Sequence, residues 1–473
     1  MNMTDFEILF NPRAVGIIGV NDKPYGGGYF LTCLKAIGFD RDLYLFNPRL
    51  KGQTIKGCKV YGSILEIPED KPIDYVILAV PAELCPKIME EIGQKGVPFV
   101  TIFTSGFSEV GREDLEEAIL KTAFNYNIRL IGPNCLGVYN PDARLAVSRW
   151  QIPESGSFGF ISQSGGLSID ISNTAIYRFR TFISKVISVG NQIDLKVRDF
   201  LDYLREDDKT KVIGIYLENL KETNGLAGRE FKELLLQTSL KKPVILWKVG
   251  FGTSTKEAIM SHTGGLAGSY KIWSDMAKQT GTILVHSSQQ LITIAAAFNH
   301  LKFNKIDRNL GIIAVGGGSS IEMTDLMEFN GLSVPKLNET TKATFKSFLP
   351  DVNTIIRNPL DLGGDGLSPE TFGKSLITLA NDPGISVIVF SKSYYFNEAF
   401  IESILRAKKQ IDKPIICVAP TIREDLDFHK EKLFFKQKML ENGILVLESI
   451  DITAKVLKKM YDYKKFLIRR KKL

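Results

Sequence analysis

The chain has 473 residues, of which 44% are hydrophobic and 24% charged, and its formal net charge is +7. This composition is typical of soluble globular proteins, and the length allows two to four domains. The small positive charge suits anionic ligands, but no motif supports nucleic-acid binding and no apolar run is long enough to cross a bilayer. The five cysteines form no CxxC pair and the histidines show no metal-ligand spacing, so neither a metal site nor a disulfide framework is expected. We expect a cytoplasmic protein, because the N-terminus is not a secretory signal.

Short apolar runs rich in valine and isoleucine alternate with amphipathic stretches along the whole chain. Continuous apolar strands that alternate with helices indicate parallel sheets with helices on both faces. The pattern starts three times, so we predict an α/β chain of three doubly wound domains in series, covering residues 1–142, 143–304 and 305–473. The expected strands are Ala14–Val20, Leu43–Phe46, Tyr75–Val80, Phe99–Phe103, Arg129–Ile131, Ser157–Ile161, Phe182–Ile187, Val212–Leu217, Val244–Trp247, Thr282–Val285, Leu310–Val315, Ser386–Phe390, Pro414–Val418 and Ile444–Leu447.

The first strand of each predicted domain ends in a glycine- or serine-rich turn that leads into a helix. These turns begin at Gly19, Ser162 and Gly316. Exposed backbone N–H groups and the helix dipole make such a turn a site for anions. Turns of this kind also occur where a helix only packs against a strand, so each turn alone fits either role. None has the spacing of a P-loop.

The turn at Gly19 differs from a dinucleotide site. It lacks GxGxxG spacing, and the second strand ends in Asn47-Pro48-Arg49 instead of the acid that binds the ribose of NAD. A nicotinamide-dependent oxidoreductase is therefore disfavoured. The cation at Arg49 suits a phosphorylated ribose or another phosphate.

One of the four histidines, His262, lies in the glycine-rich segment SHTGGLAG at residues 261–268. If a helix connects the predicted strands Val212–Leu217 and Val244–Trp247, these strands are parallel. Glu218, the turn at Ser162 and the loop of His262 would then share the edge where open α/β sheets bind ligands. An imidazole, a carboxylate that orients it and a helix N-terminus suit covalent phosphoryl transfer. A loop histidine without a chemical role is the alternative.

These motifs together resemble the ADP-forming acetyl-CoA synthetases of the succinyl-CoA synthetase superfamily. SHTGGLAG is similar to the phosphohistidine loop of that family, and further motifs occur in the family's order over nearly the whole chain. They are GPNCLG at Gly132–Gly137, SQSGG at Ser162–Gly166, Gly190-Asn191, YLE at Tyr216–Glu218 and NPLD at Asn358–Asp361. The resemblance implies a Rossmann-like CoA-binding domain at 1–142 and a flavodoxin-like domain with the phosphohistidine loop at 143–304. It implies a second flavodoxin-like ligase domain at 305–473.

The resemblance also implies the site residues. His262 would carry the phosphoryl group and Glu218 would support it. The phosphate would lie between two turns, formed by Ser162, Gln163, Ser164, Gly165 and Gly166 and by Gly317, Gly318, Ser319 and Ser320. Coenzyme A and the acyl group would lie against Gly19, Asn21, Asn47, Pro48, Arg49, Val80, Pro81, Pro133 and Asn134. The chain departs from the family at Val20-Asn21, where a small residue and a serine are usual.

The implied reaction reversibly converts acyl-CoA, inorganic phosphate and ADP into a carboxylic acid, CoA and ATP, through an acyl phosphate and phospho-His262. No ATP-grasp segment is recognised after Arg308. The resemblance therefore implies an ATP-grasp beta subunit as a separate partner, in an α2β2 heteromer, that holds ADP or ATP with Mg²⁺. The alternative is a catalytically silent CoA-binding or CoA-sensing protein of the same fold.

Overall fold

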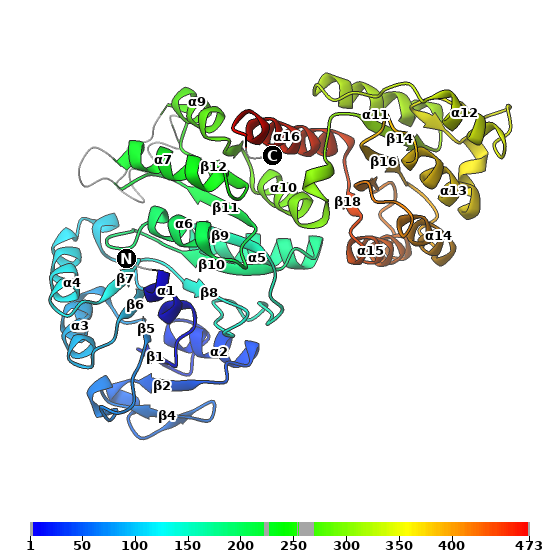
Figure 1. Cartoon of the computed structure of the whole chain (residues 1–473). Coiled ribbons are helices and arrows are strands. Elements are labelled where there is room, and N and C mark those ends of the chain that lie inside the picture. Colours follow the sequence, from blue (N-terminus) through cyan, green and yellow to red (C-terminus); the bar gives the residue numbers. More distant parts are fainter. Residues whose placement is uncertain (1–2, 222–226, 253, 255–268, 472–473) are drawn as a thin grey trace. The chain divides into compact units, whose positions relative to one another are not determined.

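The structure, a computed structural model, describes residues 3–221, 227–252, 254 and 269–471. The chain divides into two compact units. Unit 1 comprises Met1–Arg178 and Phe182–Leu291, and unit 2 comprises Phe179–Thr181 and Ile292–Leu473. Unit 1 contains two of the three sheets and unit 2 contains the third (Figure 1).

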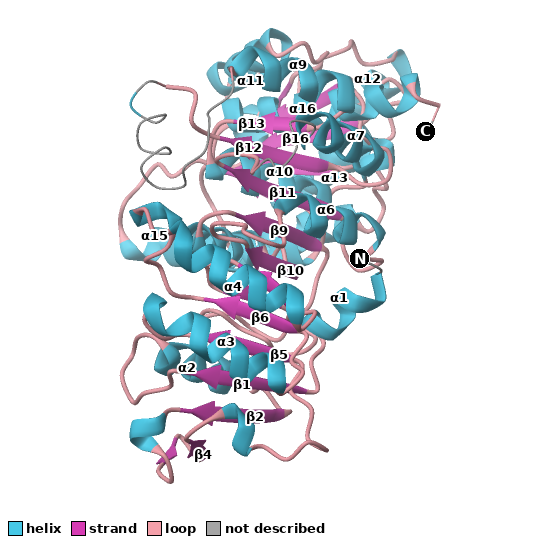
Figure 2. Ribbon diagram, turned by 90° about the vertical axis from the view of Figure 1, so that its left-hand side faces the viewer, coloured by secondary structure: helices cyan, strands magenta, loops and turns pink. Residues whose placement is uncertain are grey.

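Sheet 1 is the N-terminal sheet of unit 1. Its strands pair in the order β3-β4-β2-β1-β5-β6-β7, and every pair except β3–β4 is parallel. Figure 2 shows β4, β2, β1, β5 and β6 following one another in this order. Without the edge strand β3, this is the strand order of the Rossmann fold. The strands are β1 (Ala14–Ile18), β2 (Asp42–Phe46), β3 (Thr54–Ile55), β4 (Cys58–Tyr61), β5 (Tyr75–Leu78), β6 (Phe99–Ile102) and β7 (Arg129–Ile131).

Sheet 2 completes unit 1. Its strands pair in the order β13-β12-β11-β9-β10-β8, and only β8 is antiparallel to its neighbour. Without β8, this is the flavodoxin-like order, in which the first and third strands lie side by side at the switch point. The strands are β8 (Gly137–Tyr139), β9 (Phe158–Ser162), β10 (Ile183–Ser188), β11 (Val212–Leu217), β12 (Val244–Lys248) and β13 (Ile283–Val285).

Helix α6 of unit 1 buries one apolar stripe. In α6, Val197, Phe200, Leu201 and Leu204 recur at helical spacing and are all buried. The helices are α1 (Met3–Phe10), α2 (Gly27–Ile37), α3 (Cys85–Gln94), α4 (Glu113–Asn125), α5 (Gly165–Phe179), α6 (Val197–Glu206), α7 (Ala227–Ser239), α9 (Tyr270–Thr280) and α10 (Ser288–His300), of which α5 and α10 run on into unit 2. Among the described residues, short 3-10 helices cover Pro48–Leu50, Ile64–Glu66, Ala82–Leu84, Ser108–Val110, Phe303–Lys305 and Gly363–Leu367.

Polar and aromatic contacts join the two sheets of unit 1. Arg129, at the start of β7, donates two hydrogen bonds of 2.9 Å to the carboxylate of Asp194, which follows β10. Phe6 of α1 packs against Phe200 and Tyr203 of α6, with ring centroids 5.3 and 5.2 Å apart. These contacts hold the segments of sheet 1 against those of sheet 2.

Sheet 3 forms the centre of unit 2. Its strands pair in the order β15-β14-β16-β17-β18, and all pairs are parallel. This is again the flavodoxin-like order, with its switch point between β14 and β16. The strands are β14 (Leu310–Ala314), β15 (Leu360–Asp361), β16 (Val387–Ser391), β17 (Ile415–Val418) and β18 (Leu445–Leu447). The helices are α11 (Gly317–Phe329), α12 (Glu339–Lys346), α13 (Pro369–Ala380), α14 (Glu398–Lys408), α15 (Leu426–Glu441) and α16 (Ile450–Arg469).

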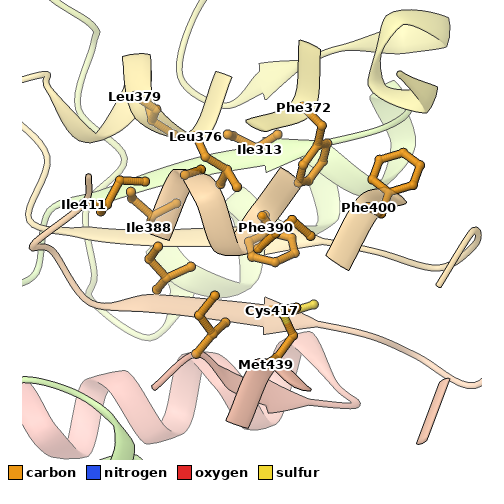
Figure 3. Close-up of a cluster of buried hydrophobic side chains, with 14 of the residues drawn as sticks. Ile313, Phe372, Leu376, Leu379, Ile388, Phe390, Phe400, Ile411, Cys417 and Met439 are labelled. Carbon is orange, nitrogen blue, oxygen red and sulfur yellow. The ribbon is translucent and has the colours of Figure 1, made fainter. Parts of the chain in front are cut away.

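One hydrophobic cluster of unit 2 lies between sheet 3 and the helices on one of its faces. Alternate residues of a strand point to the same face, and Ile388 and Phe390 of β16 are fully buried there. Phe372 of α13 and Phe400 of α14 pack beside them, with ring centroids 5.9 Å apart (Figure 3). The same face carries Cys417 of β17.

The predicted α/β fold with three largely parallel sheets is confirmed, and each predicted strand is present. The sequence patterns did not predict β3, β4, β8 and β15, which are short strands at or near sheet edges. β8 lies before residue 142 but pairs with sheet 2, and the domain limits at 142 and 304 stay a prediction. Of the helices within the described residues, none combines the length and the apolarity that a membrane span requires.

Candidate functional site

Gly19 lies at the carboxyl end of β1, where CoA is predicted to bind. Its N–H donates to the carbonyl of Phe46, at the end of β2, at 3.0 Å. Gly19 has a φ of +88°, and a Cβ atom there would lie 2.2 Å from the carbonyl oxygen of Ala79, which follows β5. Only glycine therefore fits where these three strand ends converge.

Asn47 connects two of these strand ends. Its Nδ2 donates to the carbonyl of Val20 at 2.7 Å, and its Oδ1 accepts a hydrogen bond from the N–H of Arg49 at 3.0 Å. The Arg49 side chain is thereby placed, exposed, at the carboxyl edge of sheet 1. Val20 is fully buried, and Oδ1 of Asn21 accepts from the N–H of Lys23 at 2.9 Å. The Gly19 turn is thus tied down by backbone and side-chain bonds, and a cation lies beside it.

Thr104, which follows β6, connects the other residues predicted for the CoA and acyl site. Its Oγ1 donates to the carbonyl of Val80 at 2.5 Å, and its carbonyl accepts from the N–H of Asn134 at 2.9 Å. The carbonyl of Pro133 accepts from the N–H of Asn191 at 2.9 Å. The structure therefore gathers the strand ends that carry Gly19, Asn47, Val80-Pro81 and Pro133-Asn134 at one edge of sheet 1. No sequence signal indicated Thr104.

The turn from Ser162 to Gly166 is closed by its own side chains. Ser162 Oγ donates to the carbonyl of Ser164 at 2.7 Å, and Ser164 Oγ accepts from the N–H of Leu167 at 3.4 Å. Gly165 begins α5, and a Cβ atom at Gly166 would meet nothing within 4 Å. The space beside Gly166 in the first turn of α5 is therefore open, and the helix dipole favours an anion there.

Gln163 connects this turn to Glu218 across the switch point between β9 and β11. Its Oε1 accepts hydrogen bonds from the N–H of Glu218 and, at 3.0 Å, from the N–H of Asn219. Its Nε2 lies 3.3 Å from Oδ1 of Asn219. All three side chains are buried. The side-chain oxygen of Gln163 thus fixes the backbone that carries Glu218, a contact that the sequence did not predict.

The carboxylate of Glu218 is held by a tyrosine of β11, the strand that ends just before it. The hydroxyl of Tyr216 lies 3.1 Å from Oε1 of Glu218. Burial raises the pKa of Tyr216, and the negative charge of Glu218 raises it further. Tyr216 therefore stays a neutral donor to the carboxylate at physiological pH.

Lys248, the last residue of β12, supports the same segment. Its Nζ donates to the carbonyl of Glu218 at 2.7 Å and also to that of Val249. Burial lowers the pKa of Lys248 to about 8, although the charge of Glu218 acts in the opposite direction. The sequence showed Lys248 only as a lysine that ends an apolar strand. His262 lies outside the described residues, so its place relative to Glu218 stays a prediction.

The turn at the start of α11 in unit 2 is organised by the NPLD motif. Oδ1 of Asp361 accepts from the N–H groups of Gly316 and Gly363, both at 2.9 Å. Asn358 of the same motif accepts from the N–H of Ile312 at 2.9 Å and so holds β14. Gly318 and Ser319 are exposed, whereas Ser320 is buried and donates to the carbonyl of Gly317 at 2.8 Å. The N-terminus of α11 is thereby open in the manner of the Ser162 turn of unit 1.

Within the described ranges, no group of three or more His, Cys, Asp or Glu side chains is placed to hold a metal ion. Unit 1 presents a helix N-terminus, a buried carboxylate and a set of converging strand ends, and unit 2 presents a second helix N-terminus. Such groups bind anions and orient an imidazole, so the chemistry they suit is acyl and phosphoryl transfer.

Comparison with known proteins agrees with the acyl and phosphoryl transfer that these groups suit. Residues 13–141 match a family described as CoA binding domain, and residues 155–298 match the succinyl-CoA ligase like flavodoxin domain. The chain is 32% identical to the alpha subunit of ADP-forming acetate–CoA ligase II of Pyrococcus furiosus, over 87% of this chain and 89% of the relative. It is also 32% identical to the alpha subunit of isozyme I of that organism, over 98% and 99%.

A solved structure shows the same relationship. The dinucleotide forming acetyl-coenzyme A synthetase 1 of Candidatus Korarchaeum cryptofilum, in complex with phosphate and ADP, superposes with a TM-score of 0.85 at 27% identity, covering 98% of each chain. The chain therefore belongs to the family of the ADP-forming acetate–CoA ligase alpha subunits.

Proposed function

We propose that this chain is the CoA-binding, phosphohistidine-carrying subunit of an NDP-forming acyl-CoA synthetase. In this reaction acyl-CoA, inorganic phosphate and ADP form a carboxylic acid, CoA and ATP, and the reverse reaction activates the acid. The single observation that supports the proposal most strongly is the junction of the Ser162 turn with Glu218 through Gln163, at the switch point of sheet 2. The reaction that we assign to this junction is the one catalysed by the family to which the chain belongs.

The first step is acyl transfer to phosphate. A phosphate oxygen attacks the thioester carbonyl of acyl-CoA, the C–S bond breaks, and CoA leaves as its thiolate with an acyl phosphate as the second product. In our proposal the strand ends at Gly19, Asn47 and Val80 hold CoA, and the exposed Arg49 pairs with one of its phosphates. The Pro133-Asn134 turn, fixed by Thr104 and Asn191, borders the acyl group.

The second step is phosphoryl transfer to His262. A neutral imidazole nitrogen attacks phosphorus, the P–O bond to the acyl oxygen breaks, and the carboxylate leaves. The carboxylate of Glu218 accepts the N–H of the other ring nitrogen and stabilises the cationic ring that results. The open N-terminus of α5, and that of α11 in unit 2, neutralise the charge on the phosphoryl oxygens. Gly166 and Gly318, whose missing side chains leave free space, allow close approach of an anion.

The third step requires a second protein. We propose that an ATP-grasp beta subunit binds ADP with Mg²⁺ and takes the phosphoryl group from His262, and that the complex is an α2β2 heteromer. The loop of His262 contains three glycines, Gly264, Gly265 and Gly268, which suit movement between two sites.

The test is formation of phosphohistidine on the isolated chain. Acetyl-CoA and radiolabelled inorganic phosphate are added without partner and without ADP, so that the phosphoryl group has no acceptor beyond His262. We expect acid-labile, base-stable label on wild-type protein and none on His262→Asn. The matched control is His429→Asn, because His429 is an exposed histidine of α15 in unit 2 that pairs with Glu424 at 3.1 Å. It should label like wild type.

Two results would contradict the proposal. Label that is equal on wild type and on His262→Asn would place the phosphoryl group elsewhere. Binding of CoA by the complex with its partner, without label or net reaction under any condition, would support the catalytically silent alternative.

A further inference from the structure

Leu136 lies between two parts of the candidate site in unit 1. It follows Asn134 by two positions, and its side chain is partly exposed. A Cβ atom at Gly165, the first residue of α5, would lie 3.1 Å from Cγ and 3.3 Å from Cδ1 of Leu136. The side chain of Leu136 therefore packs against the first turn of α5 and joins the Pro133-Asn134 turn to the turn at Ser162–Gly166.

The backbone on both sides of Leu136 is fixed. The N–H of Leu136 donates to Oγ of Ser188, the last residue of β10, at 3.1 Å, and Ser188 is fully buried. Cys135 is buried, and a Cβ atom at Gly137 would lie 2.5 Å from the hydroxyl oxygen of Tyr75. The segment thus has little room to shift, and the side chain of Leu136 forms a rigid wall beside α5.

The first step of the proposed reaction brings the acyl group to this wall, so this inference rests on the proposed function. A phosphate oxygen that accepts from the first N–H groups of α5 lies about 3 Å from them. The attacking oxygen reaches the carbonyl carbon from about 3–3.5 Å. With the width of the phosphate included, the carbonyl carbon lies within roughly 9 Å of the start of α5. A substituent on that carbon then has Leu136 as an apolar neighbour.

We propose that Leu136 is a specificity-determining residue that limits the bulk of the acyl group next to its carbonyl carbon. An acetyl group fits beside the side chain, whereas a branch on the adjacent carbon, as in 2-methylpropanoyl-CoA, meets Cγ or Cδ1 of Leu136. Gly165 has an indirect role, because its missing Cβ leaves the space in which Leu136 lies against the helix. One methyl or methylene group against an apolar wall changes selectivity by about 10–200-fold, so a single leucine suffices.

The experiment measures the initial rate of phosphohistidine labelling of the full chain, with radiolabelled phosphate and either acetyl-CoA or 2-methylpropanoyl-CoA. The measured quantity is the ratio of the branched to the acetyl rate, which is independent of the amount of folded protein. We expect Leu136→Ala to raise this ratio about tenfold or more and Leu136→Phe to lower it about threefold or more. Leu136→Ile, which keeps the volume, should change it less than either. The matched control is Leu120→Ala, because Leu120 is a partly buried leucine of α4 that packs against the core of sheet 1 in the same unit. It should leave the ratio unchanged.

A double-mutant cycle with Gly165→Ala tests the contact itself. The helical backbone at Gly165 suits alanine, but the new Cβ atom would lie 3.1 Å from Cγ of Leu136 and would push that side chain toward the acyl group. Gly165→Ala should therefore lower the ratio about threefold in the wild-type background and leave it unchanged in Leu136→Ala, where Cγ is absent. Any effect of Gly165→Ala on phosphate binding is common to both substrates and cancels in the ratio.

Two label results would overturn the role of Leu136. If wild type labels but the ratio is the same in wild type, Leu136→Ala and Leu136→Phe, Leu136 does not set specificity and the proposed function stands. A ratio that rises equally in Leu120→Ala has the same consequence, because general loosening of unit 1 then accounts for the change.

A binding measurement keeps the role of Leu136 testable without phosphorylation. If wild type does not label at all, the proposed function fails, and calorimetric binding of the two acyl-CoA molecules without phosphate decides whether Leu136 borders the acyl group. Leu136→Ala should still improve the affinity for 2-methylpropanoyl-CoA relative to acetyl-CoA. Unchanged relative affinities would overturn the proposal.

Discussion

Replacement of Gln163 by leucine tests how the candidate site is held together. In the wild type, Oε1 of Gln163 accepts from two consecutive backbone N–H groups, those of Glu218 and Asn219. Leucine has a similar size but no acceptor, so both donors lose their partner in a place where water has little access. Glu218 is 7% exposed and Asn219 is 1% exposed. The backbone that carries Glu218 should then shift away from the Ser162 turn.

The size of the effect follows from those two bonds. A buried N–H without an acceptor costs about 1–3 kcal/mol, so two cost about 2–6 kcal/mol. Burial of the leucine side chain offsets about 1 kcal/mol of this. We expect the free energy of unfolding of unit 1 to fall by about 3 kcal/mol. Each kcal/mol lowers the thermal midpoint of a unit this large by about 2–4 °C, so the midpoint should fall by about 6–12 °C. Phosphohistidine label from acetyl-CoA and phosphate should fall at least tenfold at a temperature where the variant is folded.

Gln151→Leu is the matched control for this variant. Oε1 of Gln151 also accepts from two consecutive N–H groups, those of Val147 at 2.8 Å and Ser148 at 3.0 Å, and Gln151 is 3% exposed in the same unit. It should lower the thermal midpoint comparably and leave the label intact. Circular dichroism measures the midpoint of thermal unfolding, and filter-bound radioactivity measures the phosphohistidine label. The reasoning fails if Gln163→Leu unfolds within 1 °C of wild type, or if both variants lose label to the same extent.

Three further predictions concern other parts of the fold. Gly19→Ala should lower the free energy of unfolding by about 3 kcal/mol and weaken CoA binding measured by calorimetry. The reason is that the new Cβ atom would lie 2.2 Å from the carbonyl oxygen of Ala79, at a residue with a positive φ. An unchanged unfolding midpoint would contradict this. Asp361→Ala should lower the free energy of unfolding in urea by about 2 kcal/mol, and Asp361→Asn should lower it less, because asparagine keeps an oxygen acceptor for the turn before α11. Equal losses would refute the role of Oδ1 of Asp361. The pKa of Lys248 is lowered from 10.5 to about 8. Between these two pH values the native state has released a proton that the unfolded chain keeps, so the contribution of Lys248 to the free energy of unfolding rises with pH. Between pH 7.5 and 9.5 wild type should gain about 2 kcal/mol relative to Lys248→Met, and a difference that does not vary with pH would exclude this titration.

The sheets could be predicted because their central strands are buried on both faces. β11 reads VIGIYL and β16 reads VIVFS, and every residue of β11 is buried. Such continuous apolar runs have few alternative structures. β3 and β15 contain two residues each, too few to produce a period, and β8 contains three. β8 also pairs with β10, more than forty residues later in the chain, and no local pattern records such a partner.

The parts of the site that were predicted are those carried by one short segment. Glycines before a helix, a carboxylate after a strand and a histidine among glycines are each visible within a few residues. The contacts that fix these groups are long-range. Gln163 reaches Glu218 over 55 positions, and Thr104 reaches Val80 over 24. A side chain that binds distant backbone leaves no signal beyond its own presence, so Gln163, Thr104 and Asp361 became interpretable only in the folded chain.

Lysines at strand ends show how far a sequence pattern can be taken once the topology is known. Lys248 and Lys392 both come at the end of an apolar strand, and burial lowers the pKa of both. Lys248 ends β12, away from the switch point of its sheet, and two carbonyls satisfy it. Lys392 follows β16 at the switch point of sheet 3, and its Nζ lies over the ring of Phe400, 3.0 Å from the centroid. The same pattern, a lysine at the end of an apolar strand, therefore has carbonyl partners in one sheet and aromatic rings in the other, and only the folded chain distinguishes the two.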